Sequence, residues 1–334
     1  MAQQGSGRGG WGWRRAGMAL AVTLALSAPA AAQTEGRWAL IVSGASGGEK
    51  YAEQLGQWRQ TLRSALVDRY GFDAERVRVL VDEAAGAGTV GSAANVRAAL
   101  ADIRKAAGSE DLVLVVLLGH GTFDGEVAKF NLVGPDLTAQ EWNQLLGGLP
   151  GRLVIVNTTS ASYPFLDALK ARGRVVITAT NSAAQKYATV FPEYFAKALS
   201  EASTDLDKNG RTSILEVFEA TSLAVTQHYE QRGQLTTERA LLDDTGDGAG
   251  REQGADGADG GLARLWHFDA PPAAAAANPE LAALLRQQRA LETEAESLKQ
   301  RRDDMPAADW QAAYEKLMIE LARVSQEIRK RSER

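Results

Sequence analysis

Two groups of polar residues stand directly after apolar runs, where a strand would end. His120 follows seven consecutive apolar residues, 112–118, and lies between Gly119 and Gly121. A histidine with such small neighbours is accessible and can act as an acid or a base, although it can also simply bond local backbone. The second group, the loop 157–162, offers several hydroxyl groups after another apolar run. These hydroxyls are candidate nucleophiles, and no cysteine accompanies them.

The elements that would position these residues alternate between strand and helix patterns. Strands are predicted at 38–44, 76–82, 111–121, 152–157 and 174–180, and helices at 51–71, 95–107, 138–146 and 191–199. Thr138 and Glu141 have the spacing of a capping box at the start of the third helix. Near-continuous apolar strands separated by helices indicate an α/β fold with a mostly parallel sheet covered on both faces. Ligands bind beyond the carboxyl ends of such strands, where His120 and the loop 157–162 are expected to lie.

The strand LVLVVLLGHG, followed by LVIVNTTSASYPFLDAL, resembles the caspase/legumain/gingipain superfamily of cysteine peptidases. In that family one strand ends in His-Gly. About forty residues later, another strand ends in a pattern like Asp-Ala-Cys-x-Ser-Gly and leads into a helix. On this register His120 takes the place of the catalytic histidine, Ser160 that of the cysteine and Thr158 that of the acidic residue. Tyr163 replaces the final glycine. The resemblance covers roughly residues 38–199 and implies a caspase-like fold for the domain 36–268.

The resemblance also implies a cleft beside His120 and Ser160. Its predicted lining is Gly121, Asn157, Thr158, Ser162, Thr178, Thr180 and Asn181. A thiol near neutral pH already supplies some thiolate, whereas a serine hydroxyl needs a bonded base that a third group orients. Asp124, Glu126 and Asn157 are candidates for that third group. We therefore predict a non-catalytic relative that binds a peptide or protein partner, with a Ser160/His120 hydrolase as the alternative.

The stretch DLDKNGRTSILE, residues 205–216, has the order of an EF-hand loop. Oxygen ligands fall at positions 1, 3 and 5, glycine at 6, a backbone carbonyl at 7, a hydroxyl at 9 and a glutamate at 12. The corresponding residues are Asp205, Asp207, Asn209, Gly210, Arg211, Ser213 and Glu216. The pattern predicts a structural calcium site, although no partner hand is evident and position 8 is Thr212. The alternative is a solvated turn that caps the following helix. A calcium-stabilised structural protein of the cell envelope is thus a third function to consider.

The remainder of the chain is rich in charge. Residues 243–261 are expected to form an acidic, solvated loop, in which Asp243, Asp244 and Asp247 form a weaker cation-site candidate. A Pro/Ala linker at 269–279 precedes two charged helical segments in 280–334, which a break at 303–306 separates. Their narrow apolar seams predict a helical hairpin that docks on the core, forms a homo-oligomer or binds a partner. The alternative is a partly disordered tail.

Composition and the amino terminus limit the setting. A net charge of −5 does not favour a nucleic-acid partner, and the absence of cysteine excludes disulfides and thiolate metal sites. Residues 1–32 combine arginines, a short apolar run at 16–27 and a small-residue site at 30–32, which is typical of a signal peptide. The alternative is an uncleaved anchor. We expect export to the periplasm or the extracellular space, with no membrane span in the mature chain.

Overall fold

The computed structural model describes residues 35–82, 88–270 and 278–332. The predicted signal peptide and most of the predicted linker lie outside the described residues. In the described part of the chain, no helix combines the length and apolar character needed to cross a membrane.

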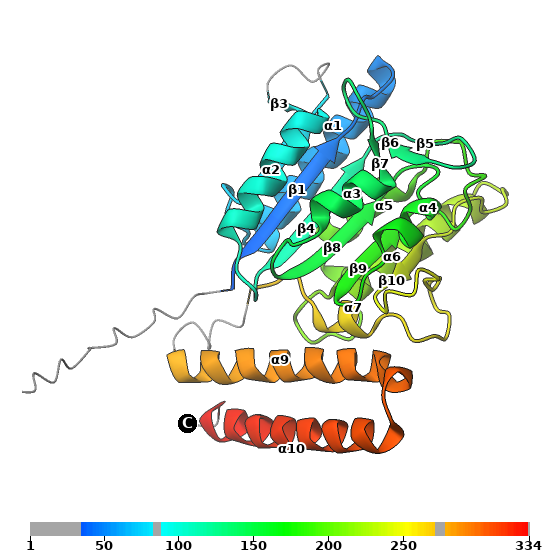
Figure 1. Cartoon of the computed structure of the whole chain (residues 1–334). Helices are drawn as coiled ribbons and strands as arrows, with labels where there is room; N and C mark the ends of the chain where they lie inside the picture. The colour runs from blue at the N-terminus through cyan, green and yellow to red at the C-terminus, as the bar shows by residue number, and fades with distance from the viewer. Residues whose placement is uncertain (1–34, 83–87, 271–277, 333–334) are drawn as a thin grey trace, which may run out of the picture. The chain divides into compact units, whose positions relative to one another are not determined.

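A seven-stranded sheet forms the centre of the domain (Figure 1). Its strands are β1 (Arg37–Ser43), β2 (Val77–Val81), β3 (Thr89–Val90), β4 (Leu112–Leu118), β8 (Arg152–Asn157), β9 (Arg174–Thr178) and β10 (Leu241–Asp243). They lie in the order β10-β9-β8-β4-β1-β2-β3. All neighbours pair in parallel except β10, which runs antiparallel to β9 at the edge. The predicted mostly parallel sheet is thus confirmed.

Helices cover both faces of this sheet, because alternate strand residues point to opposite sides. Ala39 and Ile41 of β1 pack with α1 (Glu49–Ser64), α5 (Phe191–Ser200), α6 (Ile214–Glu230) and α7 (Gly261–Leu265). Trp38, Leu40 and Val42 pack instead with α2 (Ala93–Ala106), α3 (Ala139–Leu146) and α4 (Tyr163–Leu169). The predicted α/β class with helices on both faces is therefore confirmed.

Local signals in the sequence account for several helix ends. Thr138 and Glu141 form the predicted capping box at the start of α3. Ser213 and Glu216 form a second one at the start of α6. The predicted helix 51–71 is divided, because α1 passes into a π-helical turn, η1 (Ala65–Arg69). A short 3-10 turn, η3 (Ala202–Thr204), follows α5.

A small antiparallel sheet follows the strand that ends before His120. It consists of β5 (Gly121–Phe123), β6 (Ala128–Phe130) and β7 (Leu137–Thr138). Phe130 and Leu137 are fully buried and pack against the α2 and α3 face of the domain. Sequence patterns did not predict this sheet, and its first strand holds Gly121 in extended backbone next to His120.

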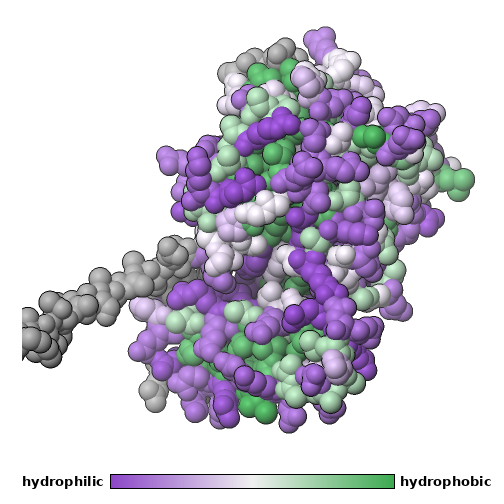
Figure 2. Space-filling model, in the orientation of Figure 1, coloured by the Kyte–Doolittle hydropathy of each residue, from purple (hydrophilic) through white to green (hydrophobic). Residues whose placement is uncertain are grey.

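The carboxyl-terminal segment forms a helical hairpin, as predicted (Figure 1). Helix α9 (Pro279–Gln300) is followed by the short turn η4 (Arg302–Asp304) and by α10 (Ala307–Ser332). Leu291 and Leu298 of α9 pack on Leu317 and Val324 of α10, in an apolar cluster that belongs to the hairpin alone. On the face that Figure 2 shows, hydrophilic residues dominate and apolar patches gather on the hairpin.

The acidic stretch 243–261 differs from the prediction of a solvated loop. Asp243 and Asp244 are buried, at 1% and 0% exposure, and Asp243 closes the edge strand β10. Asp243 accepts hydrogen bonds from the backbone N–H groups of Gly246 and Gly248. Asp244 accepts them from Gly260 and Ala263 at the start of α7. Burial of the two carboxylates is thus compensated by backbone N–H groups, of the local turn for Asp243 and of the start of α7 for Asp244, which composition alone does not reveal.

Candidate functional site at the carboxyl edge of the sheet

Strands β4 and β8 bring the two predicted catalytic positions to one edge. The strands are parallel neighbours, with Leu117 opposite Asn157, so the residues that follow them emerge side by side. Ser160 Oγ lies 3.4 Å from the carbonyl oxygen of Gly121 and donates to it. A Cβ atom at position 121 would meet the Ser160 carbonyl oxygen at 2.4 Å. Glycine is therefore required here by the close approach of the two strand ends.

The His120 ring is oriented by a backbone carbonyl. Its Nε2 lies 2.9 Å from the carbonyl oxygen of Ser46, which can only accept, so Nε2 carries the proton. The imidazole also packs against the ring of Tyr51 in a T-shaped contact, with ring centroids 4.9 Å apart. Nδ1 is then the lone-pair nitrogen, which is the atom a base would use. Sequence reasoning could not find this orienting group, because every residue carries a carbonyl.

Two of the three residues considered from sequence as orienting groups, Asp124 and Asn157, accept hydrogen bonds elsewhere. Asp124 accepts hydrogen bonds from the backbone N–H groups of Glu126 and Val127 in its own turn. Asn157 Oδ1 accepts from the backbone and the side chain of Thr159. In the described chain no hydrogen bond joins Asp124, Glu126 or Asn157 to His120, so the structure assigns the orienting role to none of the three candidates.

Ser160 itself is poorly placed as a nucleophile. Its exposure is 4%, and its hydroxyl is directed at the Gly121 carbonyl. In the described chain no hydrogen bond joins Ser160 to His120. The next residue, Ala161, has a φ of 49°, a left-handed conformation that is uncommon for alanine. The Ala161 N–H donates to the Gln185 carbonyl, which holds this strained turn in place.

The hydroxyl side chains around Ser160 form a buried network. Ser162 and Thr180 lie 3.0 Å apart through their hydroxyl oxygens, which joins the loop after β8 to the end of β9. Thr158 donates to the Leu117 carbonyl, and Thr178 to the Thr180 carbonyl. All four are at most 1% exposed. Their role in lining a cleft stays a prediction, and in this conformation they position backbone rather than face solvent. Asn181 is more open and donates to Glu252.

A hollow of about 220 Å³ lies beside His120. Its lining includes Tyr51 and Trp58 of α1, and Thr189 and Glu193 at the start of α5. The Thr189 hydroxyl donates to the Thr158 carbonyl, so the wall of the hollow is attached to the loop that carries Ser160. The hollow beside His120 therefore has both aromatic and polar walls.

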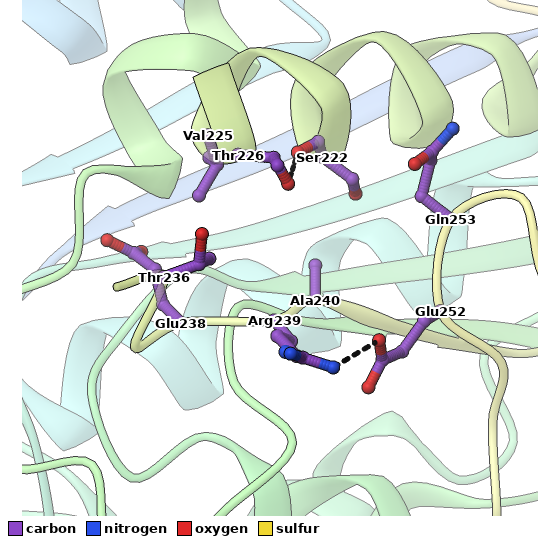
Figure 3. Close-up of a pocket in the computed structure, with 9 residues that line it drawn as sticks. All are labelled: Ser222, Val225, Thr226, Thr236, Glu238, Arg239, Ala240, Glu252 and Gln253. Carbon is purple, nitrogen blue, oxygen red and sulfur yellow. Dashed lines mark hydrogen bonds and ion pairs between the residues drawn. The ribbon is translucent and has the colours of Figure 1, made fainter. Parts of the chain in front are cut away.

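A second hollow, of about 230 Å³, lies between α6 and the segment before β10 (Figure 3). Ser222 and Thr226 reach into it from the helix, and Ala240 faces them from the segment below. Arg239 pairs with Glu252 at its rim, at 3.4 Å. Ser222 Oγ is buried and has no hydrogen-bond partner among the described residues.

Glu238 connects this second hollow to the one beside His120. Its carboxylate accepts hydrogen bonds from the backbone N–H groups of Val190 and Phe191, where α5 begins. It also accepts one from the hydroxyl of Tyr229. Burial raises the pKa of Glu238. Burial, together with the neighbouring Glu238 carboxylate, raises the pKa of Tyr229 to about 12. Glu238 thus caps α5 from a different element, a role that sequence reasoning missed because capping is normally local.

Three of the predicted ligands in the EF-hand-like loop lie together, and their carboxylates also accept hydrogen bonds from local backbone N–H groups, as the alternative of a capping turn expects. Carboxylate oxygens of Asp205, Asp207 and Glu216 lie within 4.8 Å of one another. Gly210 has a φ of 79°, as the sharp turn at position 6 requires. Asp205 accepts the N–H groups of Asn209 and Gly210, and Glu216 accepts those of Leu206 and Asp207. Hard oxygen ligands are the kind that Ca²⁺ prefers, and calcium binding by this loop stays a prediction.

The end of the EF-hand-like loop pairs with residues 266–268 through a short antiparallel contact. Ser213 and His267 form an antiparallel bridge. The Thr212 carbonyl accepts from the Phe268 N–H, and the Trp266 carbonyl from the Ile214 N–H. Burial and the nearby Arg211 lower the pKa of His267 to about 4, while its Nδ1 lies 3.0 Å from the Leu265 carbonyl. Thr212 at position 8 therefore pairs within the domain.

Comparisons with known proteins give partial support to the resemblance. No family model matches the sequence. A segment of 57 residues is 44% identical to metacaspase-4 of Arabidopsis thaliana, covering 17% of this chain and 13% of the metacaspase. The match therefore spans only a small part, 13%, of the length of that metacaspase. The matched segment supports a caspase-like fold.

Two solved structures are similar over most of the chain. Protein GSU0716 from Geobacter sulfurreducens is 15% identical, with a TM-score of 0.44, and the match covers 71% of this chain and 100% of that one. The Drosophila initiator caspase Dronc is 11% identical, with a TM-score of 0.39, over 65% of this chain and 82% of the caspase.

Proposed function

We propose that this protein is a caspase-related binding module that lacks peptidase activity. One observation carries the proposal: the Ser160 hydroxyl donates to the Gly121 carbonyl, whereas the His120 ring is bonded to the Ser46 carbonyl. A serine needs a hydrogen-bonded base to react, and this arrangement does not provide one. The hollow beside His120 would then hold a side chain of a peptide or protein partner without cleaving the chain.

A hydrolase is the second candidate, and two features favour it. The His120 ring is held by Ser46 in the tautomer that leaves Nδ1 free as a base. The strained turn at Ala161 stores conformational energy directly after Ser160, as is common at functional sites. A rotation that brings the Ser160 hydroxyl to Nδ1 would be required for activity.

A gain-of-function variant separates the two candidates. Wild type, Ser160→Ala and Ser160→Cys are incubated with a diverse peptide mixture, and the products are identified by mass spectrometry. We expect wild type and Ser160→Ala to leave every peptide intact. Ser160→Cys is expected to cleave a subset, because a thiol supplies its own thiolate. Fluorescence anisotropy then tests whether wild type binds the peptides of that subset. Cleavage by wild type that Ser160→Ala abolishes would instead establish the hydrolase.

Because the chain has no cysteine, a reagent that reacts with thiols provides a control for the Ser160→Cys variant. Ser160→Cys carries the only thiol, so the rate of alkylation by iodoacetamide reports on that atom alone. Adding His120→Ala should slow alkylation near neutral pH, since the imidazole no longer assists ionisation. If the alkylation rate does not depend on His120, the two residues do not form a site.

We further propose that residues 205–216 bind Ca²⁺ as a structural ion. The support is the convergence of Asp205, Asp207 and Glu216 together with the turn at Gly210. Ca²⁺ at 100 times its dissociation constant would stabilise the fold by about 2.7 kcal/mol. Thermal unfolding should therefore respond to a chelator in wild type and not in Asp205→Ala. Equal melting temperatures of wild type with and without chelator would end the calcium proposal.

We also propose that the protein is exported. The support is the basic start, the apolar run and the small-residue site within residues 1–32. Fractionation of expressing cells and sequencing of the amino terminus test this, with a start at Gln33 expected. If the chelator test succeeds but neither peptide binding nor cleavage is found, a calcium-stabilised envelope protein becomes the better interpretation.

A further inference from the structure

The carboxyl-terminal hairpin has an apolar cluster of its own. The described domain has two apolar clusters, one on each face of the sheet, and neither contains a residue of α9 or α10. The hairpin's own cluster extends from Leu284 to Ile328. Leu291 and Leu298 are only 7% and 5% exposed because α10 covers them. The residues of this cluster are thus covered by the facing helix of the hairpin, whereas Leu281 near the start of α9 is buried outside the cluster.

Besides the packing of α7 on α9, several polar contacts join the hairpin to the domain. Arg289 of α9 bonds Glu35 through two nitrogens, at 2.5 and 3.2 Å. Gln300 donates to the Asp244 carbonyl at 2.9 Å, and Arg172 pairs with Asp304. Contacts of this kind are weaker than an apolar interface and allow domains to move relative to each other.

Glu35 is the centre of this junction. Its carboxylate also pairs with Arg152 of the domain, at 3.4 Å, and its side chain is 9% exposed. One carboxylate therefore lies between two arginines, one from each side of the junction. Arg211 adds a further positive charge nearby. Burial and repulsion from Arg289 lower the pKa of the Arg211 guanidinium. Removing Glu35 would leave buried positive charges facing one another.

The junction lies away from the candidate site. Glu35 precedes β1 and Arg152 begins β8, so both stand at the amino ends of the strands, whereas His120 and Ser160 follow the carboxyl ends. Helix α9 lies between the domain and α10, as Figure 1 shows. Movement of the hairpin would therefore leave His120 and Ser160 unobstructed.

We infer that the hairpin is a detachable arm, held by an electrostatic latch of Arg152, Glu35 and Arg289, and that it undocks without unfolding. The latch charges are largely buried, and salt screens buried pairs less than exposed ones, so the docked state should weaken only at high ionic strength. The packed seam between α9 and α10 is insensitive to salt and should persist. This inference does not depend on whether Ser160 reacts.

Paired fluorescent labels test the latch in the full chain. Cysteines replace two exposed residues, Lys105 on α2 and Lys316 on α10, which is straightforward in a cysteine-free protein. Energy transfer between the labels is followed from low salt to about 1 M NaCl, at an ionic strength where screening acts within ~3 Å. We expect transfer to fall while far-UV circular dichroism stays constant.

Two further variants make the outcome decisive. Glu35→Gln should undock at a salt concentration several-fold lower than wild type. Asp102→Asn removes the exposed pair between Arg78 and Asp102, which lies within the domain, and should behave as wild type. Energy transfer that is unchanged by salt and by Glu35→Gln would overturn the latch. Transfer that falls only together with helical dichroism would overturn the independent folding of the arm.

Discussion

Replacing Gly121 by alanine tests whether the ends of β4 and β8 really meet at the candidate site. The added methyl group would lie 2.4 Å from the Ser160 carbonyl oxygen and 2.6 Å from Thr159 Oγ1. Both distances are well below van der Waals contact, so one of the two strand ends must move. Both contacts are with the loop that carries Ser160, which makes the substitution specific to this junction.

The expected cost follows from the rigidity of that loop. Ser160 and Thr159 are 4% and 0% exposed, and the Thr159 hydroxyl is already bonded to Asn157 and to the Ser160 carbonyl. Overpacking of such a site costs about 1–3 kcal/mol. In a domain of this size that corresponds to a fall in melting temperature of about 2–4 °C per kcal/mol.

Gly56→Ala is the matched control, because it is the same substitution within helix α1. The nearest atom to its new Cβ is 3.7 Å away, so there is no clash. Removing a helical glycine should stabilise the protein by about 0.5–1 kcal/mol. The two variants are compared by urea denaturation, and the free energies of unfolding should change with opposite signs. A Gly121→Ala protein as stable as wild type would refute the proposed contact between the strand ends.

Three further substitutions test local interactions, all measured with chelator present. The pKa of His267 is about 4 in the folded protein, below its usual 6.5. The contribution of His267 to the free energy of unfolding is therefore present above pH 6.5 and is lost as the pH falls. Wild type should lose about 2 kcal/mol relative to His267→Gln between pH 7 and 4.5, and parallel pH profiles would contradict this. Burial raises the pKa of Asp244 to about 6, so protonation favours the folded state as the pH falls. Wild type should therefore gain about 2 kcal/mol relative to Asp244→Asn over the same range, whereas a loss would reverse the assignment. Asp111→Ala should cost about 2 kcal/mol or more, since Asp111 accepts hydrogen bonds from Gly36, Trp38 and Gly108. An unchanged urea midpoint would show that these bonds contribute little.

The central sheet could be predicted because its strands are apolar on both faces. The run 112–118 is buried along its whole length in β4, and 152–157 matches β8 residue for residue. The strand order and the antiparallel edge strand β10 could not be predicted, since they depend on contacts distant in sequence. Leu241 and Leu242 are too short a run to stand out beside the acidic residues that follow.

Some features of the candidate site could also be predicted from the sequence, and others could not. His120 and the loop of Ser160 were identifiable because they interrupt apolar runs, and the loop 205–216 because its ligand spacing is periodic. The Ser46 carbonyl that orients His120 and the cap that Glu238 supplies to α5 were not identifiable. The first is a backbone group without a side-chain signal, and the second joins residues that are 48 positions apart. The same limit applies to Asp244, whose hydrogen bonds with Gly260 and Ala263 join residues 16 and 19 positions apart.

Labelling of the intact protein with a fluorophosphonate probe, which reacts with activated serines, tests most directly whether Ser160 is a nucleophile. Wild type, Ser160→Ala and His120→Ala are exposed to the probe, and the adduct is located by mass spectrometry. Because the Ser160 hydroxyl is bonded to the Gly121 carbonyl and not to His120, we predict no adduct at Ser160 in any of the three. An adduct on Ser160 of wild type that His120→Ala abolishes would contradict the account and establish a serine hydrolase.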